Sequence, residues 1–382
     1  MMKKKVLLTV DWFVPGYKAG GPVQSCANLV AHLKEEIDFY IITRDTDYCE
    51  TLPYQGITSD AWNTLDAHIQ VYYFSAGKLT FRNLHQVIRS VAPDIAYING
   101  IYSLYFSILP LYILKRQQHP HIIVSARGML ASSAINVKRH RKKLFLSIAK
   151  RLRLYKGIIF HATHEGEKQA ILQAIDSEAT VLVAPNLPKV TDAHANSRRA
   201  KTAGELKLVN IARISPEKNL LYALEVLAGW QHSGRISFDI YGPVYDVAYW
   251  EACQELMKRL PSTINATYKG SLKTNEVVAT LNQNHALWMP TRGENFGHII
   301  LESFTSGCPV LISDQTPWQD LAHRQVGFDL PLSTPAAFVN ALETFVHMGQ
   351  EAYDRWSENA YHYGQQVIND KDAVALNQLM FR

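Results

Sequence analysis

Short runs rich in valine, isoleucine and tyrosine alternate with longer helical patterns along almost the whole of this 382-residue chain. Two parallel strands need a long connection between them, which is usually a helix, so the alternation indicates parallel sheets with helices on both faces. The predicted fold class is therefore α/β. We expect strands near residues 5–10, 38–43, 69–74, 94–98, 122–125, 158–161, 180–184, 206–212, 236–241, 264–268, 286–289 and 310–312.

The length and composition of the chain indicate two domains. A domain usually contains about 100 to 200 residues. An apolar content of 47% is enough for two full-sized hydrophobic cores. Between residues 185 and 205 the alternating pattern gives way to a polar stretch without apolar periodicity, which we interpret as the interdomain linker. The predicted domains are residues 1–187 and 188–350.

Neither a disulfide framework, a zinc site nor a membrane span is expected. The four cysteines are dispersed without paired spacing, at Cys26, Cys49, Cys253 and Cys308. The most tempting membrane segment, residues 95–114, is interrupted by Asn99 and Pro110, so a buried strand followed by a buried helix explains it better. We therefore expect a protein of the reducing cytoplasm.

Residues 294–302 set two carboxylates around a predicted helix start. Gly297 opens an amphipathic run, Glu294 lies in the loop before it, and Glu302 falls about a turn and a half into the helix. The first backbone N–H groups of a helix and its dipole favour a phosphate, whereas carboxylates accept hydrogen bonds from sugar hydroxyls. A sugar joined to a phosphate satisfies both. The alternative is that both glutamates are ordinary surface acids.

Two cations flank another predicted strand-to-helix loop. Arg213 follows the strand near residues 206–212, and Lys218 enters the first turn of the next predicted helix. A lysine gains nothing from the helix dipole there, so an anionic ligand at the carboxyl ends of the strands is the better explanation. The alternative is that Arg213 pairs with an acid and Lys218 is solvated.

A glycine pair follows the first predicted strand. Gly20 and Gly21 lie directly before a predicted helix, and adjacent glycines let the backbone approach a ligand closely. The dinucleotide fingerprint needs a third glycine at fixed spacing, which is missing here, so a nicotinamide cofactor is not expected. A simple glycine-rich turn is the alternative.

Residues 138–156 are strongly basic and interleaved with apolar side chains. An amphipathic helix of this kind suits the surface of an anionic membrane, although a nucleic-acid patch has the same electrostatic character. A net charge of only +5 and the absence of a reader motif favour the membrane over nucleic acid. A solvated basic helix is the remaining alternative. The cations are Lys138, Arg139, Arg141, Lys142, Lys143, Lys150, Arg151, Arg153 and Lys156.

Together, residues 294–302, 307–310, 213–219 and Gly20-Gly21 resemble the family-4 retaining glycosyltransferases of GT-B architecture. The resemblance implies two Rossmann-like domains whose parallel sheets face a central cleft. It also implies a C-terminal segment, residues 351–382, that packs back on the acceptor-binding first domain. Residues 125–130 and 161–165 are similar to members that build bacterial surface polysaccharides such as O-antigen, capsule or exopolysaccharide.

The resemblance also implies a role for each motif residue. Glu302 would bind the ribose of the donor nucleotide, and Glu294 would contact the transferred sugar. Arg213 and Lys218 would neutralise the donor diphosphate. The backbone of the helix start would complete that cradle, and the glycine pair would close over the phosphates. These cradle residues are Asn295, Phe296, Gly297 and His298 in the second domain, with Gly20 and Gly21 in the first.

The implied reaction moves a hexose from a nucleotide diphosphate sugar to a saccharide or polyprenyl-diphosphate-linked saccharide, with retention of configuration. Arg213, Lys218 and the helix start can hold the departing phosphate without a metal ion, so no cofactor is expected. Residues 45–47 spell Asp-x-Asp, which we interpret as a polar turn rather than a metal site. Two alternatives are a catalytically silent subunit that binds a partner or a sugar nucleotide, and a sugar-nucleotide epimerase of the same architecture.

Overall fold

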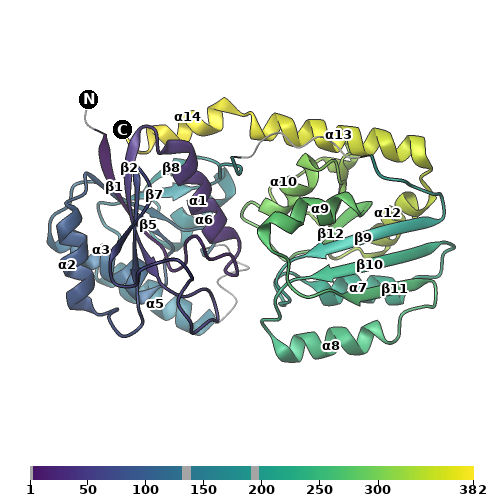
Figure 1. The fold of residues 1–382 in the computed structure, drawn as a ribbon, viewed down its shortest axis with the longest axis horizontal. Coiled ribbons are helices and arrows are strands. Elements are labelled where there is room, and N and C mark those ends of the chain that lie inside the picture. The colour runs from purple at the N-terminus through teal and green to yellow at the C-terminus, as the bar shows by residue number, and fades with distance from the viewer. Residues whose placement is uncertain (1–2, 131–138, 191–197) are drawn as a thin grey trace. The chain divides into compact units, whose positions relative to one another are not determined.

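The computed structural model describes residues 3–130, 139–190 and 198–382, and the chain divides into two compact units. Unit 1 comprises Met1–Val190 and Asp370–Arg382, and unit 2 comprises Thr191–Asn369 (Figure 1). The sequence placed this boundary between residues 187 and 188, and it ended the second domain at residue 350. In the structure the second unit extends further because helix α13 (Gln350–Ile368) packs against helix α10 (His298–Thr305) of the same unit.

Unit 1 contains an eight-stranded sheet in the order β3-β4-β2-β1-β5-β6-β7-β8. All neighbouring strands run parallel except the edge pair β3 and β4. The strands are β1 (Lys4–Thr9), β2 (Ile37–Arg44), β3 (Trp62–Asp66), β4 (Ile69–Phe74), β5 (Ile95–Asn99), β6 (Ile122–Ser125), β7 (Ile159–Ala162) and β8 (Thr180–Val183).

Helices cover both faces of the unit 1 sheet because its central strands are apolar on both faces. Along β1, for example, Leu7 belongs to one hydrophobic cluster and its neighbours Val6 and Leu8 belong to the other. The helices are α1 (Gly21–Leu33), α2 (Phe81–Val91), the π-helix η1 (Leu104–Ile108), α3 (Leu109–Arg116), α5 (Arg139–Arg151), α6 (Glu165–Ala174) and α14 (Lys371–Leu379).

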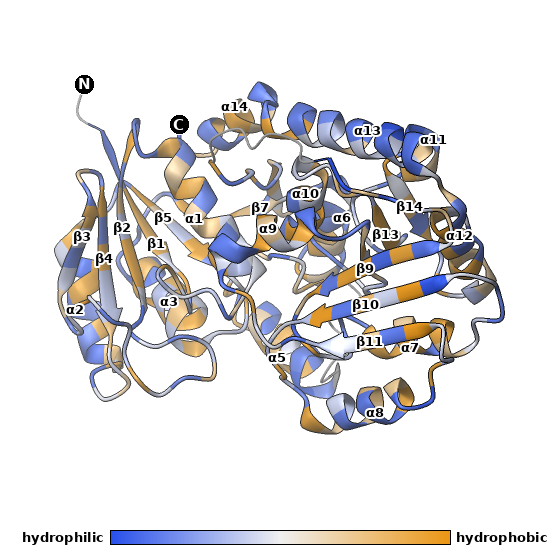
Figure 2. Cartoon of the chain, turned by 45° about the vertical axis from the view of Figure 1, so that its right-hand side comes forward, coloured by the Kyte–Doolittle hydropathy of each residue, from blue (hydrophilic) through white to orange (hydrophobic). Residues whose placement is uncertain are grey.

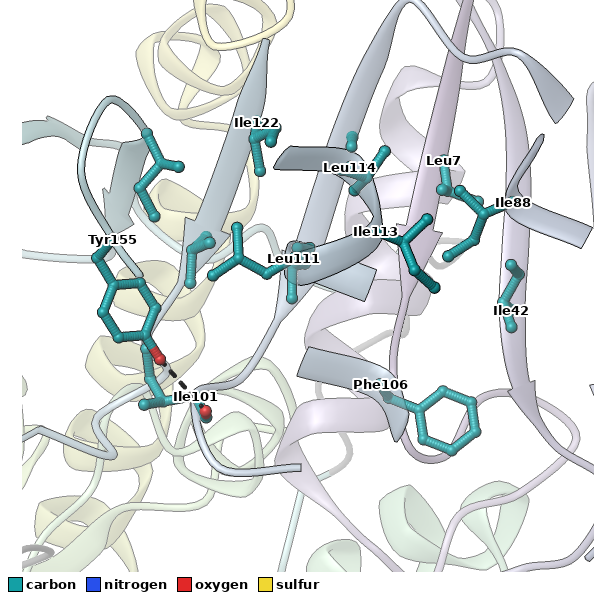
Figure 3. Close-up of a cluster of buried hydrophobic side chains, with 14 of the residues drawn as sticks. Leu7, Ile42, Ile88, Ile101, Phe106, Leu111, Ile113, Leu114, Ile122 and Tyr155 are labelled. Atoms are coloured by element: carbon teal, nitrogen blue, oxygen red, sulfur yellow. Dashed lines mark hydrogen bonds between the residues drawn. The ribbon is translucent and has the colours of Figure 1, made fainter. Parts of the chain in front are cut away.

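The cluster beneath α2, α3 and η1 is shown in Figure 3. Side chains of α3 such as Leu111 and Leu114 pack there with strand residues such as Leu7 and Ile42. Burial of an aliphatic side chain of this size contributes about 1.5–3 kcal/mol. The opposite face of the sheet is covered by α1 and α14, whose residues pack with Val6 and Leu8. The last helix of the chain therefore completes the core of unit 1.

Unit 2 contains a six-stranded, all-parallel sheet in the order β11-β10-β9-β12-β13-β14. Its strands are β9 (Glu205–Ile211), β10 (Arg235–Tyr241), β11 (Ile264–Tyr268), β12 (Ala286–Met289), β13 (Val310–Ser313) and β14 (Gly327–Leu330). Its further helices are α7 (Leu220–Ala228), α8 (Val247–Met257), the 3₁₀ helix η2 (Thr274–Glu276), α9 (Val277–Asn282), α11 (Leu321–Arg324) and α12 (Pro335–His347).

Two hydrophobic clusters pack against the unit 2 sheet. One joins β9, β10 and β12 to α7 and α12, and the other joins β12 and β13 to α9 and α10. Helix α13 contributes Tyr353 to the first cluster and Ala360 to the second. Helix α8 carries both hydrophilic and hydrophobic residues along its length, as expected for a helix that covers a core (Figure 2).

The predicted α/β class with two sheets is confirmed, and every strand that the sequence predicted is present. The sequence missed β3 and β14. Strand β3 is an antiparallel edge strand that contains Asn63, Thr64 and Asp66, and none of its residues is fully buried. Within the described residues, no helix is long and apolar enough to cross a membrane. Residues 95–114 form β5, η1 and most of α3.

Candidate active site

The residues predicted in unit 2 gather at the carboxyl ends of two adjacent strands, β9 and β12. From β9 the chain continues to β10 on one side, whereas β12 lies on the other side of β9. The strand order therefore reverses between β9 and β12, and open α/β sheets bind ligands at such a switch point. Arg213 and Lys218 follow β9, and residues 294–302 follow β12.

The loop that carries Arg213 runs alongside the end of β10. The N–H of Ala212 donates to the carbonyl of Tyr241 at 3.0 Å, and the N–H of Ile214 donates to the carbonyl of Pro243 at 2.9 Å. The guanidinium of Arg213 lies 5.2 Å from the centre of the Tyr245 ring, within cation–π range. Backbone pairing and an aromatic ring thus position Arg213.

The turn after Arg213 ends at Asn219, which has a left-handed backbone (φ 60°). The N–H of Lys218 donates to the carbonyl of Ser215 at 3.1 Å, and the amide of Asn219 donates to the carbonyl of Pro290 at 3.0 Å. Helix α7 begins only at Leu220, so Lys218 lies before the helix and not in its first turn as predicted. A left-handed residue cannot continue a helix, which explains the difference.

The loop after β12 is bonded to the loop after β9. The N–H of Arg292 donates to the carbonyl of Glu217 at 2.8 Å, and the hydroxyl of Thr291 donates to the same carbonyl at 3.1 Å. The N–H of Glu294 donates to the carbonyl of Gln315 at 3.0 Å, after β13. These bonds hold the loops of three strands in a fixed arrangement around the site.

Lys218 and Glu294 form an ion pair in this arrangement. The two residues are 76 positions apart in the sequence, and their side chains are only 18% and 12% exposed. Glu294 is therefore not a solvent-facing acid, and Lys218 is not solvated. An ion pair with this little exposure is screened less than a surface pair and constrains the position of both groups.

Helix α10 begins next to this pair. Gly297 precedes the helix with a left-handed backbone (φ 78°), and a Cβ atom there would lie 2.7 Å from Cδ1 of Ile300, so glycine is strongly favoured. Within the described residues, no side-chain hydrogen bond from the N-cap position closes the first turn of the helix. Its N-terminal end therefore offers backbone donors and the positive end of the helix dipole, which suits an anionic group.

An aromatic cluster fixes the backbone immediately before α10. The indole N–H of Trp318 donates to the carbonyl of Phe296, and the two rings are 5.5 Å apart. The ring of Phe296 also lies 4.8 Å from that of His298, which is buried. Asn295 and Glu302 are partly exposed. Glu302 is the fifth residue of α10, in agreement with its predicted place in the helix.

Gly20 and Gly21 belong to unit 1, where Gly20 precedes α1 and Gly21 is its first residue. Gly20 has a left-handed backbone (φ 72°), and no atom lies within 4 Å of a Cβ built at either position. Asp47 holds the loop before them: its Oδ2 accepts the N–H of Tyr17 at 3.0 Å and of Lys18 at 3.2 Å. The glycine pair therefore has free space beside it, and Asp47 of a second loop holds the loop that carries the pair.

Asp47 is also the second acid of the Asp-x-Asp sequence. Asp45 and Asp47 are both buried, and Oδ2 of Asp45 accepts the hydroxyl of Ser59 at 2.8 Å. Because both carboxylates hold protein groups, the segment has a structural role in unit 1. In the part of the chain that the structure describes, no group of three or more histidine, cysteine or acidic side chains could hold a metal ion.

Sequence reasoning missed several residues of the site. Tyr245 lies over Arg213, Arg292 donates from Nε to the amide oxygen of Asn219 at 3.2 Å, and Trp318 holds Phe296. The hydroxyl of Ser215 is buried and has no hydrogen-bond partner within the described residues. For Trp318 the sequence offered one signal, its place in the loop after the predicted strand at residues 310–312. The structure shows that this strand, β13, lies next to β12 in the sheet.

Residues 194–363 match a family model described as glycosyl transferases group 1. No curated protein matches the chain in sequence. Solved structures of the same fold include the sucrose-phosphate synthase of Thermosynechococcus elongatus, with a TM-score of 0.70 at 14% identity, covering 100% of this chain and 98% of that chain. Anabaena HepE in complex with UDP-glucose has a TM-score of 0.66 at 14% identity, covering 99% of this chain and 98% of that chain.

WaaG, described as a glycosyltransferase involved in lipopolysaccharide biosynthesis, also has a TM-score of 0.66, at 12% identity and 98% coverage of both chains. These likenesses establish the GT-B fold of the chain. The family match covers most of unit 2, including every candidate residue described there. Most of unit 2 is therefore similar to the group 1 glycosyl transferases.

Proposed function

We propose that the protein is a retaining glycosyltransferase of family 4. It transfers a hexose from a nucleotide diphosphate sugar to a saccharide or lipid-linked saccharide during cell-surface polysaccharide biosynthesis. The observation that carries this proposal is the Lys218–Glu294 ion pair at the switch point of unit 2, with Lys218 in the same loop as Arg213. It places a cation for phosphate and a carboxylate for sugar hydroxyls next to each other, which a nucleotide diphosphate sugar requires.

The pair has a specific role in the proposed reaction. Without a donor, Lys218 is neutralised by Glu294. A bound diphosphate offers Lys218 a second anionic partner, and Glu294 then accepts hydrogen bonds from hydroxyls of the transferred sugar. Arg213 and the N-terminal end of α10 add further positive potential for the diphosphate. The orphan hydroxyl of Ser215, in the turn between Arg213 and Lys218, is a further donor for a phosphate oxygen.

In the reaction the bond between the anomeric carbon and the phosphate oxygen breaks, and a bond from the acceptor oxygen to the same carbon forms on the same face of the sugar. The proton of the acceptor hydroxyl moves to an oxygen of the departing phosphate. Positive charge develops on the sugar and negative charge on the nucleoside diphosphate. Arg213 and Lys218 stabilise that negative charge without a metal ion, and no protein nucleophile takes part.

The solved structures of the same fold support a nucleotide-sugar donor and a role in polysaccharide biosynthesis. Anabaena HepE has been solved with UDP-glucose, and WaaG is described as acting in lipopolysaccharide biosynthesis. In the proposal Glu302 binds the ribose of the donor. The backbone of Asn295, Phe296, Gly297 and His298 and the glycine pair of unit 1 approach the phosphates.

The test is a melting experiment with UDP, GDP, ADP and their common sugar conjugates, with and without EDTA. A ligand that binds the native state raises the apparent melting temperature. We expect one nucleotide to do so in EDTA. Alanine at Glu302 should weaken that binding about 10- to 100-fold, because a hydrogen bond to a charged group is worth about 1.5–3 kcal/mol.

Glu251→Ala, an exposed glutamate of α8, is the matched control and should leave the shift unchanged. A shift that requires a divalent metal would contradict metal-free transfer. No shift with any nucleotide would favour a catalytically silent subunit that binds a partner over an enzyme.

The proposal includes a membrane-bound acceptor because of helix α5. Lys138 lies outside the described residues, but α5 and the segment after it carry exposed cations at Arg141, Lys143, Lys150, Arg151, Arg153 and Lys156. Leu144, Ile148 and Leu152 recur every four residues and are 63%, 48% and 72% exposed. An exposed apolar stripe between cations is the pattern of a helix that lies in the surface of an anionic membrane.

Serine in place of Leu144, Ile148 and Leu152 together should therefore weaken binding to vesicles that contain phosphatidylglycerol. We expect about a 10- to 100-fold loss for each side chain, because burial of such a side chain contributes about 1.5–3 kcal/mol. Vesicle co-sedimentation at several salt concentrations measures this. Leu52→Ser, which removes an exposed leucine elsewhere in unit 1, is the control. Equal binding of wild type and the triple variant would exclude this helix as the membrane contact.

A further inference from the structure

Unit 1 has a switch point of its own, between β1 and β5. From β1 the chain continues to β2 on one side, and β5 lies on the other side of β1. Three polar side chains lie at the carboxyl ends of these strands: Asp11 follows β1, Arg44 ends β2, and Ser103 follows β5. None of them belongs to the glycine loop or to the site of unit 2.

These three side chains bond to one another. One carboxylate oxygen of Asp11, Oδ1, accepts the hydroxyl of Ser103 at 2.8 Å and Nη2 of Arg44 at 3.2 Å. The backbone of Asp11 is held as well, because its carbonyl accepts the N–H of Arg44 at 3.3 Å. Burial raises the pKa of Asp11, although Ser103 and Arg44 oppose the shift. The side chains of Asp11 and Arg44 are still 22% and 32% exposed, so a ligand can reach them.

Two aromatic rings lie next to the guanidinium of Arg44, which pairs with Asp11. The guanidinium of Arg44 lies 5.0 Å from the centre of the Phe106 ring and 5.8 Å from that of Trp12. Trp12 meets Tyr48 edge to face at 4.8 Å, and both rings are partly exposed. Nε of Arg44 has no hydrogen-bond partner within the described residues. The two rings therefore help to hold Arg44, and its buried Nε is a donor that no described group uses.

The chemistry of this group selects a class of ligand. A carboxylate and a guanidinium side by side offer one acceptor and several donors, which suits two adjacent hydroxyls of a sugar. An aromatic ring packs against the apolar C–H face of a pyranose. The pair carries no net charge. A uronic acid would meet the carboxylate of Asp11, and an amino sugar would meet the cation of Arg44, so a neutral sugar fits best.

We propose that Asp11, Arg44 and Trp12 form a monosaccharide subsite in unit 1 that binds a neutral pyranose of the acceptor through two adjacent hydroxyls. This inference rests on the proposed function, and it names the class of acceptor sugar. Asp11 and Arg44 make the hydrogen bonds, and Trp12 contributes the apolar contact. The bond from Ser103 fixes the orientation of the Asp11 carboxylate.

The test is saturation-transfer difference NMR on the full chain with methyl glycosides as probes. The neutral probes are the methyl glycosides of glucose, galactose and mannose, and the charged probes are those of glucuronic acid and glucosamine. We expect a neutral glycoside to bind, and Trp12→Ala to weaken its affinity about five- to tenfold, the worth of one aromatic contact. Trp12→Phe should retain most of the affinity, and Asp11→Asn should lose affinity while the fold is kept.

Tyr112→Ala, which removes an exposed aromatic ring elsewhere in unit 1, is the matched control and should bind the glycosides as wild type does. Nucleotide binding is measured on the same samples. If a nucleotide binds but no neutral glycoside does, or if Trp12→Ala and Asp11→Asn leave the affinity unchanged, the subsite is overturned and the proposed function stands. Tighter binding of a charged glycoside would overturn the class of sugar. If the wild type binds none of the nucleotides, the proposed function itself is overturned.

Discussion

Alanine in place of Lys218 is expected to slow sugar transfer about 100- to 1,000-fold, the usual cost of removing one group that stabilises transition-state charge. In the proposed reaction the charge on the diphosphate is greatest when the bond to the sugar is breaking. The lysine therefore contributes more to the transition state than to donor binding, so kcat should fall much more than nucleotide affinity. The measurement is kcat and KM with the donor that the melting experiment identifies.

The ion pair with Glu294 makes this prediction specific. Removing Lys218 leaves a largely buried carboxylate without its cation, which destabilises the loops of the site as well as the reaction. The double variant Lys218→Ala with Glu294→Gln should recover stability but not activity, because the phosphate still lacks its cation. A double-mutant cycle separates the two effects. Lys258→Ala, an exposed lysine just after α8 paired with Glu255, is the control and should keep wild-type kcat.

Equal losses in kcat and in nucleotide affinity for Lys218→Ala would show that the lysine binds donor and transition state alike. Recovery of activity in the double variant would show that Lys218 acts only by neutralising the buried carboxylate of Glu294. Either result would remove Lys218 from the proposed chemistry.

The central strands could be predicted from the sequence because they are buried on both faces. A fully buried parallel strand is a continuous apolar run, as in residues 286–289. The strands that were missed lack that signal. Strand β3 pairs antiparallel at the sheet edge, and β14 is a short edge strand in which only its first residue, Gly327, is fully buried.

The predicted linker is a second case in which amino-acid composition did not predict the structure. Residues 191–197 lie outside the described residues, but Arg199 and Lys201 are buried in unit 2. Arg199 donates to the carbonyl of Gly307 at 3.0 Å and to the amide of Asn282 at 2.9 Å, and Lys201 donates to the carbonyl of Met348 at 2.9 Å. Polar residues resemble a linker in sequence, yet here they satisfy carbonyl groups of helix ends and loops.

The candidate site also contains features that the sequence could predict and features that it could not. Lys218 and Glu294 could be found because each stands in a recognisable strand-to-helix loop. Their ion pair could not be predicted, since it depends on β9 and β12 being neighbours in the sheet. The contacts of Tyr245 with Arg213 and of Trp318 with Phe296 likewise join segments that are distant in sequence. Motifs therefore identify the candidate site residues, and the sheet order determines which other residues support them.

Alanine in place of Gly242 is expected to destabilise unit 2 by about 2–5 kcal/mol, from backbone strain and overpacking together. Gly242 directly follows β10 and has a φ of 143°. A Cβ atom there would lie 1.7 Å from the carbonyl oxygen of Ala212 and 3.3 Å from the backbone nitrogen of Arg213. Because both are backbone atoms, no side-chain rotation relieves the clash. The loop that carries Arg213 must move away from β10, so nucleotide affinity should fall as well.

A chain of two units does not unfold in one step, so hydrogen exchange measured on peptides of each unit is the suitable readout. Peptides of β9 and β10 should lose protection in Gly242→Ala, whereas peptides of β1 and β5 in unit 1 should keep it. Gly229→Ala is the matched control, because its Cβ would make only ordinary contacts, the nearest at 3.6 Å. It should be neutral or stabilise unit 2 by about 0.4–1 kcal/mol. Unchanged protection and nucleotide affinity in Gly242→Ala would mean that the close approach of β10 to the Arg213 loop does not position this cation.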